Sequence, residues 1–417
     1  MQRIFHNPPP CFRPRQGGNV LYGRRMRRAR TPWRLDANVV ALGVTSFLND
    51  VSSEIIYPLL PAFLAGVLGA GPGYIGLIEG VAETTASLLK LLSGWLSDRL
   101  RKRKLLVVLG YLLAAVSRPF IAITTAPWQV LLVRFADRTG KGLRSAPRDA
   151  LLAESAAQST WGRAFGFHRA MDHLGAVVGP LIAFALVSVL HQKLRLLFAL
   201  ASLPGLLAVA TVALAVREHP AGSSYQASPS LRRTTTRLPR PLRRFLLVVF
   251  LFTLGNSTDA FLLLRAQDVG VPIAVLPLLW VVLHLVKSAS AMPGGGLSDR
   301  IGRKRVIALG WLVYAAVYLG FAAVHGPLGV WLLFAAYGIF FGLTESAEKA
   351  QVADLVGAAD RGAAFGFYHL TIGVASLPAS IVFGLLWDRW GPAAAFGSGA
   401  GLATMAALLL LTLRRDR

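Results

Sequence analysis

The chain has 417 residues, of which 54% are hydrophobic and only 15% are charged, and its formal net charge is +24. A soluble protein of this length would carry roughly a quarter charged residues, so the composition excludes an ordinary soluble domain. Apolar runs recur along the whole chain, each about 20 residues long, which is enough to cross roughly 30 Å of hydrocarbon. The sequence therefore predicts an all-α polytopic membrane protein embedded in a lipid bilayer.

The positive charge gathers in alternate loops between the apolar runs. This is the pattern of the positive-inside rule, and it argues against a nucleic-acid partner. The cations place both termini in the cytoplasm. Cys11 is the single cysteine, so the sequence allows no intramolecular disulfide. Residues 1–34 are rich in Arg and Pro and lack the apolar core of a secretory signal, so we expect a basic, disordered cytoplasmic tail. Whether that tail belongs to the mature protein stays open.

The chain divides into two halves of six predicted spans each. The amino-terminal half covers residues 35–216, a polar cytoplasmic linker covers 217–243, and the carboxyl-terminal half covers 244–417. The twelve spans are predicted near 37–66, 73–98, 104–124, 127–148, 163–190, 195–216, 244–269, 272–298, 304–324, 327–349, 363–387 and 393–413.

An internal repeat relates the two halves. The segment Gly94–Arg103 (GWLSDRLRKR) recurs as Gly295–Lys304 (GGLSDRIGRK), and each copy follows the second span of its half. Gly162–His168 recurs as Gly362–Tyr368. Two parallel six-helix repeats around a central cavity are the arrangement expected of one large class of transporters. A weaker match relates the Ser-Ser-Glu stretch that ends at Glu54 to Ser-Thr-Asp259.

These motifs resemble those of the major facilitator superfamily over about residues 35–415, most closely those of prokaryotic drug-efflux members. The signature loop of that family reads G-x-L-a-D-r-x-G-r-k. The second copy fits throughout, at Gly295, Leu297, Asp299, Arg300, Gly302, Arg303 and Lys304. The first copy keeps Gly94, Leu96, Asp98, Arg99, Lys102 and Arg103, but has Arg101 at the second Gly position. The resemblance implies a gating role for both loops.

The physical chemistry of the two loops agrees with a latch. Asp98 and Asp299 end their helices, where the helix dipole disfavours a carboxylate, so each needs a cation or another helix's amino end as a partner. Small residues at Gly94 and Gly295 allow close helix packing, and Gly302 permits a tight turn. The alternative interpretation is that the cations of these loops only fix the topology.

Buried ionisable groups are costly in lipid, so each is a candidate for function. Asp50 and Glu54 lie four residues apart on one face of the first span, and a carboxylate pair so placed suits taking up and releasing a proton. Glu79 and Glu83 repeat that spacing in the second span. The alternative is that these acids only neutralise buried cations.

Arg134, Arg138, Lys141 and Arg148 form a basic stripe along the fourth span, with Asp137 beside it. Arg134 and Arg138 are the deeper pair and need partners, for which Asp50, Glu54 and Asp137 are candidates. The family's fourth-helix motif, roughly R-x-x-q-G-x-g, fits at Arg134 and Gly140, but Arg138 occupies its first Gly position. These groups serve coupling or substrate binding, or else form a static ion-pair network.

Three further features bear on function. In the carboxyl-terminal half, Asp259 and Arg265 are among the deeper polar groups. The fifth span carries Gly175-Ala-Val-Val-Gly179-Pro180, which resembles the core of an antiporter motif and favours export. The alternative is that the same residues form a generic packing face.

We expect no metal site and no cofactor. No phosphate-binding loop is complete, so the energy would come from an ion or solute gradient.

The sequence thus predicts a non-enzymatic, monomeric secondary transporter of a prokaryotic inner membrane. We expect proton-coupled export of a small organic molecule by alternating access. The alternative is a metabolite or organic-anion carrier of the same fold, which would include importers. An alternative of another class is a membrane receptor or scaffold without transport.

Overall fold

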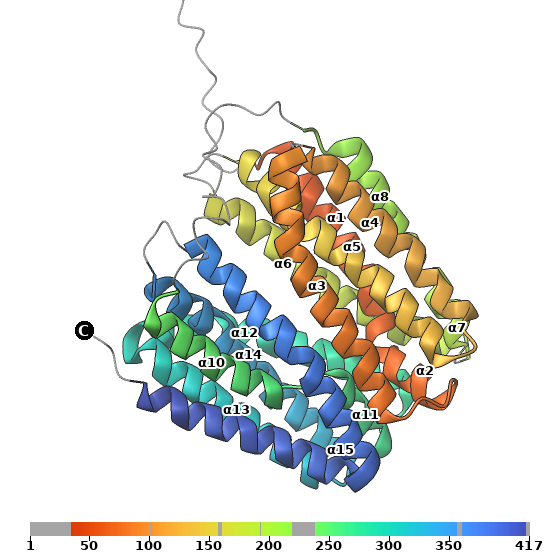
Figure 1. Ribbon diagram of the computed structural model, residues 1–417. Helices are drawn as coiled ribbons and strands as arrows, with labels where there is room; N and C mark the ends of the chain where they lie inside the picture. The colour runs from red at the N-terminus through yellow and green to blue at the C-terminus, as the bar shows by residue number, and fades with distance from the viewer. Residues whose placement is uncertain are drawn as a thin grey trace, which may run out of the picture. The chain divides into compact units, whose positions relative to one another are not determined.

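The computed structural model describes residues 35–100, 102–156, 161–191, 193–218, 238–356 and 361–413. Residues 36–417 group as one unit by their contacts, and its described elements are all helices (Figure 1). The all-α prediction is therefore confirmed for this part of the chain. The predicted tail 1–34 and most of the predicted linker 217–243 lie outside the described residues.

The amino-terminal half follows the predicted order of spans, with short breaks inside some of them. Its elements are α1 (Ala37–Ile56), η1 (Tyr57–Leu59), α2 (Leu60–Gly66), α3 (Pro72–Leu100), α4 (Arg103–Ser117), η2 (Arg118–Ile123), α5 (Pro127–Glu154), α6 (Trp161–Val189), α7 (Leu194–Leu200) and α8 (Ser202–Ala215). Prolines near the start of η1 and α2 break the first predicted span, because proline has no N–H to donate to the preceding turn.

The carboxyl-terminal half comprises α10 (Arg240–Gly255), α11 (Ala260–Asp268), η4 (Ile273–Val275), α12 (Leu276–Ile301), α13 (Arg303–Ala323), α14 (Pro327–Asp354) and α15 (Arg361–Thr412). Gly391 interrupts α15 with φ 81° and ψ 175°, which no helix contains. The long segment is therefore two helices, and the interruption falls between the eleventh and twelfth predicted spans.

Nine helical segments of the described residues are long and apolar enough to cross a membrane. The segment Ala364–Thr412, which contains Gly391, counts once among them. The helices α3 and α5 are not among the nine, although they have 29 and 28 residues. Both carry several charged side chains, which lowers their mean hydropathy. The number of twelve spans therefore remains a prediction.

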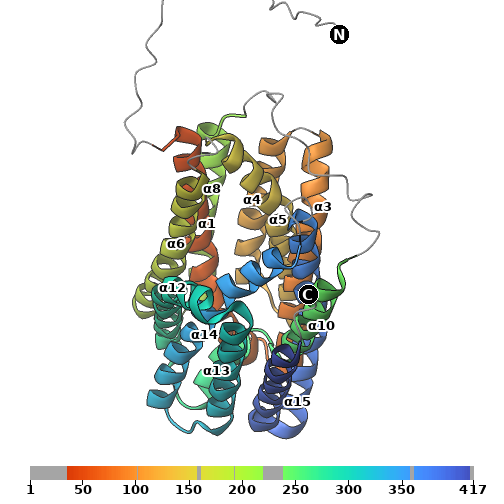
Figure 2. The same cartoon turned by 90° about the vertical axis from the view of Figure 1, so that its left-hand side faces the viewer.

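The two halves pack as separate groups of helices that meet along two main seams (Figure 1). One seam joins α3 to α15, and the other joins α6 to α12, which lie next to each other in Figure 2. At the beginning of α3, the Asp388 carboxylate of α15 accepts a hydrogen bond from the Gly73 N–H at 2.7 Å. A carboxylate at a helix amino end is favoured by the helix dipole, so this contact ties the halves together at that end.

Candidate functional site: a charged cavity between the halves

A cavity of about 600 Å³ lies between the two groups of helices. Most of its lining comes from α1, α5 and α6 of the amino-terminal half. The carboxyl-terminal half contributes Trp280 and His284 of α12, Lys349 of α14 and His369 of α15. A volume of this size is typical of sites for small organic molecules.

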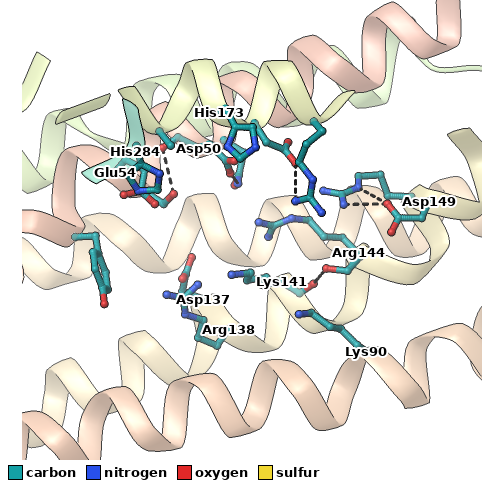
Figure 3. Close-up of a pocket in the computed structure, with 18 of the residues that line it drawn as sticks. Asp50, Glu54, Lys90, Asp137, Arg138, Lys141, Arg144, Asp149, His173 and His284 are labelled. Atoms are coloured by element: carbon teal, nitrogen blue, oxygen red, sulfur yellow. Dashed lines mark hydrogen bonds and ion pairs between the residues drawn. The ribbon is translucent and has the colours of Figure 1, made fainter. Parts of the chain in front are cut away.

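Cations outnumber acids in the lining. The cations are Lys90, Arg118, Arg134, Arg138, Lys141, Arg144, Arg148, Arg169 and Lys349, and the acids are Asp50, Glu54, Asp137, Asp149 and Asp172. Figure 3 shows Arg138, Lys141 and Arg144 along one helix, across the cavity from Asp50 and Glu54. The predicted basic stripe therefore faces the predicted acid pair through the cavity.

Arg118 organises the ion pairs at one end of this cavity. Its Nε donates to Asp137 Oδ1 at 3.0 Å, and its Nη1 donates to Ser52 Oγ at 2.8 Å. Its two Nη atoms also bond the backbone and side-chain oxygens of Asn49. Arg118 and Asp137 are only 3% and 4% exposed, so their charges compensate each other away from water.

Arg134 pairs with Glu79 rather than with the acids of α1. Its Nε and Nη2 donate to the two carboxylate oxygens of Glu79 at 2.9 and 2.6 Å. Asp137 lies 3.7 Å from Arg134 Nη1, so of the three expected partners only this one comes within ion-pair distance. The two-point pairing with Glu79 matches a charge-neutralising role for that acid, and it leaves Asp50 and Glu54 free of Arg134.

The corresponding positions of the carboxyl-terminal half carry a tyrosine network. Tyr318 and Tyr337 stand 200 residues after Arg118 and Asp137. The hydroxyl of Tyr318 bonds Ser257 Oγ at 3.3 Å, and the hydroxyl of Tyr337 donates to Asp259 Oδ1 at 2.6 Å. The repeat thus keeps its geometry, while an ionic network in one half becomes an aromatic one in the other.

Asp50 and Glu54 both line the cavity, one helical turn apart on α1. Glu54 Oε2 accepts a hydrogen bond from Trp280 Nε1 at 2.8 Å. This bond joins α1 of one half to α12 of the other. Asp50 accepts from the neighbouring Asn49 side chain at 2.9 Å.

The antiporter-like motif of α6 packs directly behind this acid pair. A Cβ at Gly175 would lie 2.8 Å from the Cβ of Asp50, and a Cβ at Gly179 would lie 2.8 Å from the Cβ of Glu54. Only glycine allows α1 to approach α6 so closely. Pro180 follows directly within α6. In this structure the motif forms part of the contact between α6 and α1, the helix that carries Asp50 and Glu54.

Four lining cations have no carboxylate oxygen within 4.0 Å among the described residues. They are Lys90, Arg138, Lys141 and Arg144, whereas the other five each have such a neighbour. Arg138 Nε and Arg144 Nη1 are buried without a hydrogen-bond partner in this part of the chain. The Arg144 guanidinium lies over the Tyr111 ring, 4.5 Å from its centroid.

The remaining predicted site residues lie near or away from the cavity. Glu83 is one turn along α3 from Glu79, and the charges of Lys141 and Arg138 act on it most strongly. Arg265 lies elsewhere, because its guanidinium donates to the carbonyls of Phe321 and Val324 at the end of α13. Arg265 therefore satisfies the carbonyls at a helix end, a structural role that its sequence position did not reveal.

The second signature loop forms its ion pairs within its own half. Asp299 bonds Arg303, and Arg303 also reaches Ser298 Oγ at 2.7 Å and Asp354 Oδ2 at 3.4 Å. Gly302 takes φ 97°, so the expected tight turn is confirmed. Arg300 is exposed and Gly295 half-buried on α12.

In the first loop, the surroundings of Gly94, the side chains of Asp98 and Arg99, and the whole of Arg101 lie outside the described part of the chain. Arg103 pairs with Glu154, and 200 residues later Arg303 of α13 pairs with Asp354 of α14. The residue before α4 is Lys102, with φ −117°.

Three residues of the cavity were not predicted from the sequence as site residues. Arg118 stands at the end of an apolar span. The one signal that could have identified it is its position 200 residues before Tyr318, which is buried. Trp280 lies within an apolar span, where an aromatic side chain more commonly packs in the core or faces lipid. His284 lines the cavity, and both of its ring nitrogens are buried without a partner in the described part of the chain.

Within the described ranges, no group of three or more His, Cys, Asp or Glu side chains is placed to hold a metal ion. The arrangement instead suits binding of a polar or charged small molecule between two helical repeats. Apolar helices, repeated halves and a charged cavity between them together define a polytopic membrane transporter.

The comparisons with known proteins agree. The family model of the Major Facilitator Superfamily matches residues 42–286 and 245–417, and the chain belongs to that superfamily. It is 37% identical over 392 residues to an uncharacterized MFS-type transporter of Methanocaldococcus jannaschii, covering 90% of this chain and 95% of that protein.

Two further comparisons are more distant. The multidrug resistance protein MdtH of Photorhabdus laumondii is 30% identical over 128 residues, which is 31% of this chain and 32% of that protein. The crystal structure of the nucleoside transporter NupG superposes with a TM-score of 0.73 at 16% identity, covering 89% of this chain and 98% of that one. The chain is thus similar in fold to solved transporters, and the resemblance to drug-efflux members remains a prediction.

Proposed function

We propose that this protein is a proton-coupled secondary transporter that moves a small organic molecule by alternating access. The cavity would hold the substrate, and Asp50 and Glu54 would carry the proton. The observation that supports this most is the hydrogen bond from Trp280 to Glu54 across the two halves. A proton on Glu54 would change a contact that the halves must break when they rock, so protonation and conformation would be linked.

Export is the favoured direction. The antiporter-like motif Gly175–Pro180 and the partial match to a multidrug resistance protein support it. The loops around Asp98 and Asp299 would act as gates that close and open as the halves move. The contacts between Gly73 and Asp388 hold one end together in this conformation, which supports access to the cavity from the other end.

A second candidate is the uptake of an organic anion with a proton. The surplus of cations across from Asp50 and Glu54 favours it. When those carboxylates are protonated, they no longer repel an anion in the cavity, so proton and anion would bind together. Binding together is the condition for symport, whereas a drug exporter exchanges the two.

The coupling is tested in proteoliposomes loaded with a pH-sensitive dye. A thermal-shift screen against metabolites, siderophores and drugs first supplies a ligand, because a molecule that binds the native state raises its melting temperature. Adding that ligand outside should acidify the lumen in symport and alkalinise it in antiport. Glu54→Gln keeps an oxygen for Trp280 but cannot ionise, so we expect gradient-driven accumulation to be lost while substrate exchange persists.

The control is Arg243→Gln, which removes an exposed charge at the start of α10. It should accumulate substrate like the wild type. Asp50→Asn and Arg134→Ala extend the series. If all three cavity variants accumulate the ligand at the wild-type level, the proton site is elsewhere and the coupling proposal is abandoned. Ligand binding without any movement across the membrane would instead point to a receptor.

A further inference from the structure

We infer that Arg138 and Lys141, with Lys90 beside them, form the binding site for a negatively charged group of the transported molecule. The substrate is then a small organic anion. This inference rests on the proposed transport function, because it names the substrate class of the same cavity. It goes beyond that proposal by naming the side chains that receive the substrate, and it favours the organic-anion candidate.

Each acid of the cavity lining already has a hydrogen-bond partner other than Arg138 and Lys141. Asp137 is bonded by Arg118, and Asp149 is bonded by Arg148. Glu54 accepts from Trp280. Asp50 and Asp172 accept hydrogen bonds from Asn49 and Ser46, respectively, and Asp172 also has His168 and Arg169 nearby.

The electrostatic free energy of Arg138 and Lys141 is unfavourable in this arrangement. Arg138 and Lys141 lie three residues apart on α5, so they share one face of the helix and repel each other. Both are partly buried and line the cavity, and neither has a carboxylate oxygen within 4.0 Å in the described residues. A desolvated charge without a counter-charge is unfavourable, and an anionic group between the two side chains relieves both penalties.

The neighbouring charges strengthen the positive field at this place. Lys90 reaches the same part of the cavity from α3, as Figure 3 shows. Arg144 lies one turn further along α5, with Nη1 buried and unpartnered in the described chain. The acids whose charges act most on Lys141 are Glu83 and Asp50, and neither forms an ion pair with it among the described residues.

The carboxyl-terminal half has no counterpart of Arg138 and Lys141. Gly338 and Phe341 of α14 stand 200 residues after Arg138 and Lys141. The basic stripe is therefore not a general requirement of the fold, which builds the same helix in the other half without it. A single anion site, on the amino-terminal side of the cavity, follows from that difference.

Binding of matched probes to the purified full chain tests this inference. The anionic probes are phthalate and phenyl phosphate, the neutral analogue is phthalamide, and the cationic one is phenyltrimethylammonium. Each is titrated at constant ionic strength while thermal unfolding is followed. We expect the anions to raise the melting temperature saturably and the other two to leave it unchanged. In Arg138→Gln/Lys141→Gln the apparent Kd for the anions should rise about tenfold or more.

The matched control is Arg240→Gln/Arg243→Gln, which removes two exposed charges outside the cavity and should keep the wild-type affinity. A second readout is quenching of tryptophan fluorescence, since Trp280 lines the cavity and reports binding even if a variant melts early. The inference is overturned if neither anion binds, if the cation binds instead, or if anion binding survives in the cavity variant. Anion binding without transport would overturn the proposed function and leave the anion site standing.

Discussion

At the scale of single residues, the ion pair of Arg118 and Asp137 sets the stability of the cavity wall. Both side chains are almost fully buried, and Arg118 also holds Ser52 and Asn49 of α1. A buried pair adds little net stability over an apolar replacement, but breaking it leaves an uncompensated charge. The two effects can be separated by removing one partner or both.

We predict that Arg118→Met lowers the free energy of unfolding by about 3–5 kcal/mol, because Asp137 then stays buried without its main partner. Thermal unfolding in detergent, followed by tryptophan fluorescence, measures the loss. Arg118→Met/Asp137→Leu should recover most of it, since neither charge remains. A double variant as unstable as the single one would show that the bonds to Ser52 and Asn49, and not the ion pair, carry the stability.

At the scale of elements, the crossing of α1 and α6 places the acid pair. Gly175 and Gly179 let the two helices touch behind Asp50 and Glu54. Sequence spacing predicted both the acid pair and the small-residue motif, but not that they lie back to back. Packing between helices decided that, because the rotation of each helix about its own axis depends on all of its neighbours.

We predict that Gly179→Ala reduces the transport rate and lowers the free energy of unfolding by about 1–3 kcal/mol, because the new Cβ would lie 2.8 Å from the Cβ of Glu54 and 2.9 Å from the Val51 carbonyl oxygen. Gly166→Ala on the same helix is the matched control, since a Cβ there meets no atom within 4 Å. Transport and melting temperature are measured for both. Equal losses in the two variants would mean that the contact with α1 is not responsible, since Ala is the better helix former at both positions.

At the scale of the whole molecule, two kinds of contact join the halves. One is the seam of α3 and α15, which ends in the bond between Gly73 and Asp388. The other is the bond between Glu54 and Trp280 at the cavity. The proposed alternating access requires both contacts to change, so weakening either should shift the balance between conformations.

We predict that Asp388→Asn depopulates the described conformation by about two- to fivefold, because a neutral amide gains less from the amino end of α3 than a carboxylate does. The measurement is the rate at which a membrane-impermeant maleimide labels Ser145→Cys, a cavity position, in a Cys11→Ser background. The reagent is added on the side to which the cavity opens in the described conformation, opposite Gly73 and Asp388. Labelling should slow in Asp388→Asn and stay at the wild-type rate in Asp388→Glu. An unchanged rate in Asp388→Asn would show that this contact does not hold the conformation.

Much of the fold could be predicted from the sequence, because each part depends on local signals. Apolar length marks the spans, and Pro127 and Pro327 begin corresponding helices 200 residues apart. The helices α3 and α5 were also predicted as spans from their apolar runs, although neither is among the nine described segments that are apolar enough to cross a membrane. The basic stripe on α5 followed from helical spacing alone.

The partners of the buried charges could not be predicted in the same way. From the sequence, Asp50, Glu54 and Asp137 were the candidate partners of Arg134. In the tertiary structure, Arg134 instead donates to both carboxylate oxygens of Glu79 in α3. Arg265 resembled a cavity residue in the sequence and instead satisfies carbonyls of α13. Such pairings join residues 55 or more positions apart, and helix periodicity carries no information over that distance.

Composition and spacing act within one helix, so they are enough to predict the membrane class, the duplication and the residues able to carry charge into the cavity. Which cations are neutralised, and which face the cavity without a carboxylate partner among the described residues, depends on the tertiary structure. The reason is that a charge in a low-dielectric interior is governed by its nearest neighbours in space, and in this protein those neighbours come from other helices and, for Glu54, from the other half.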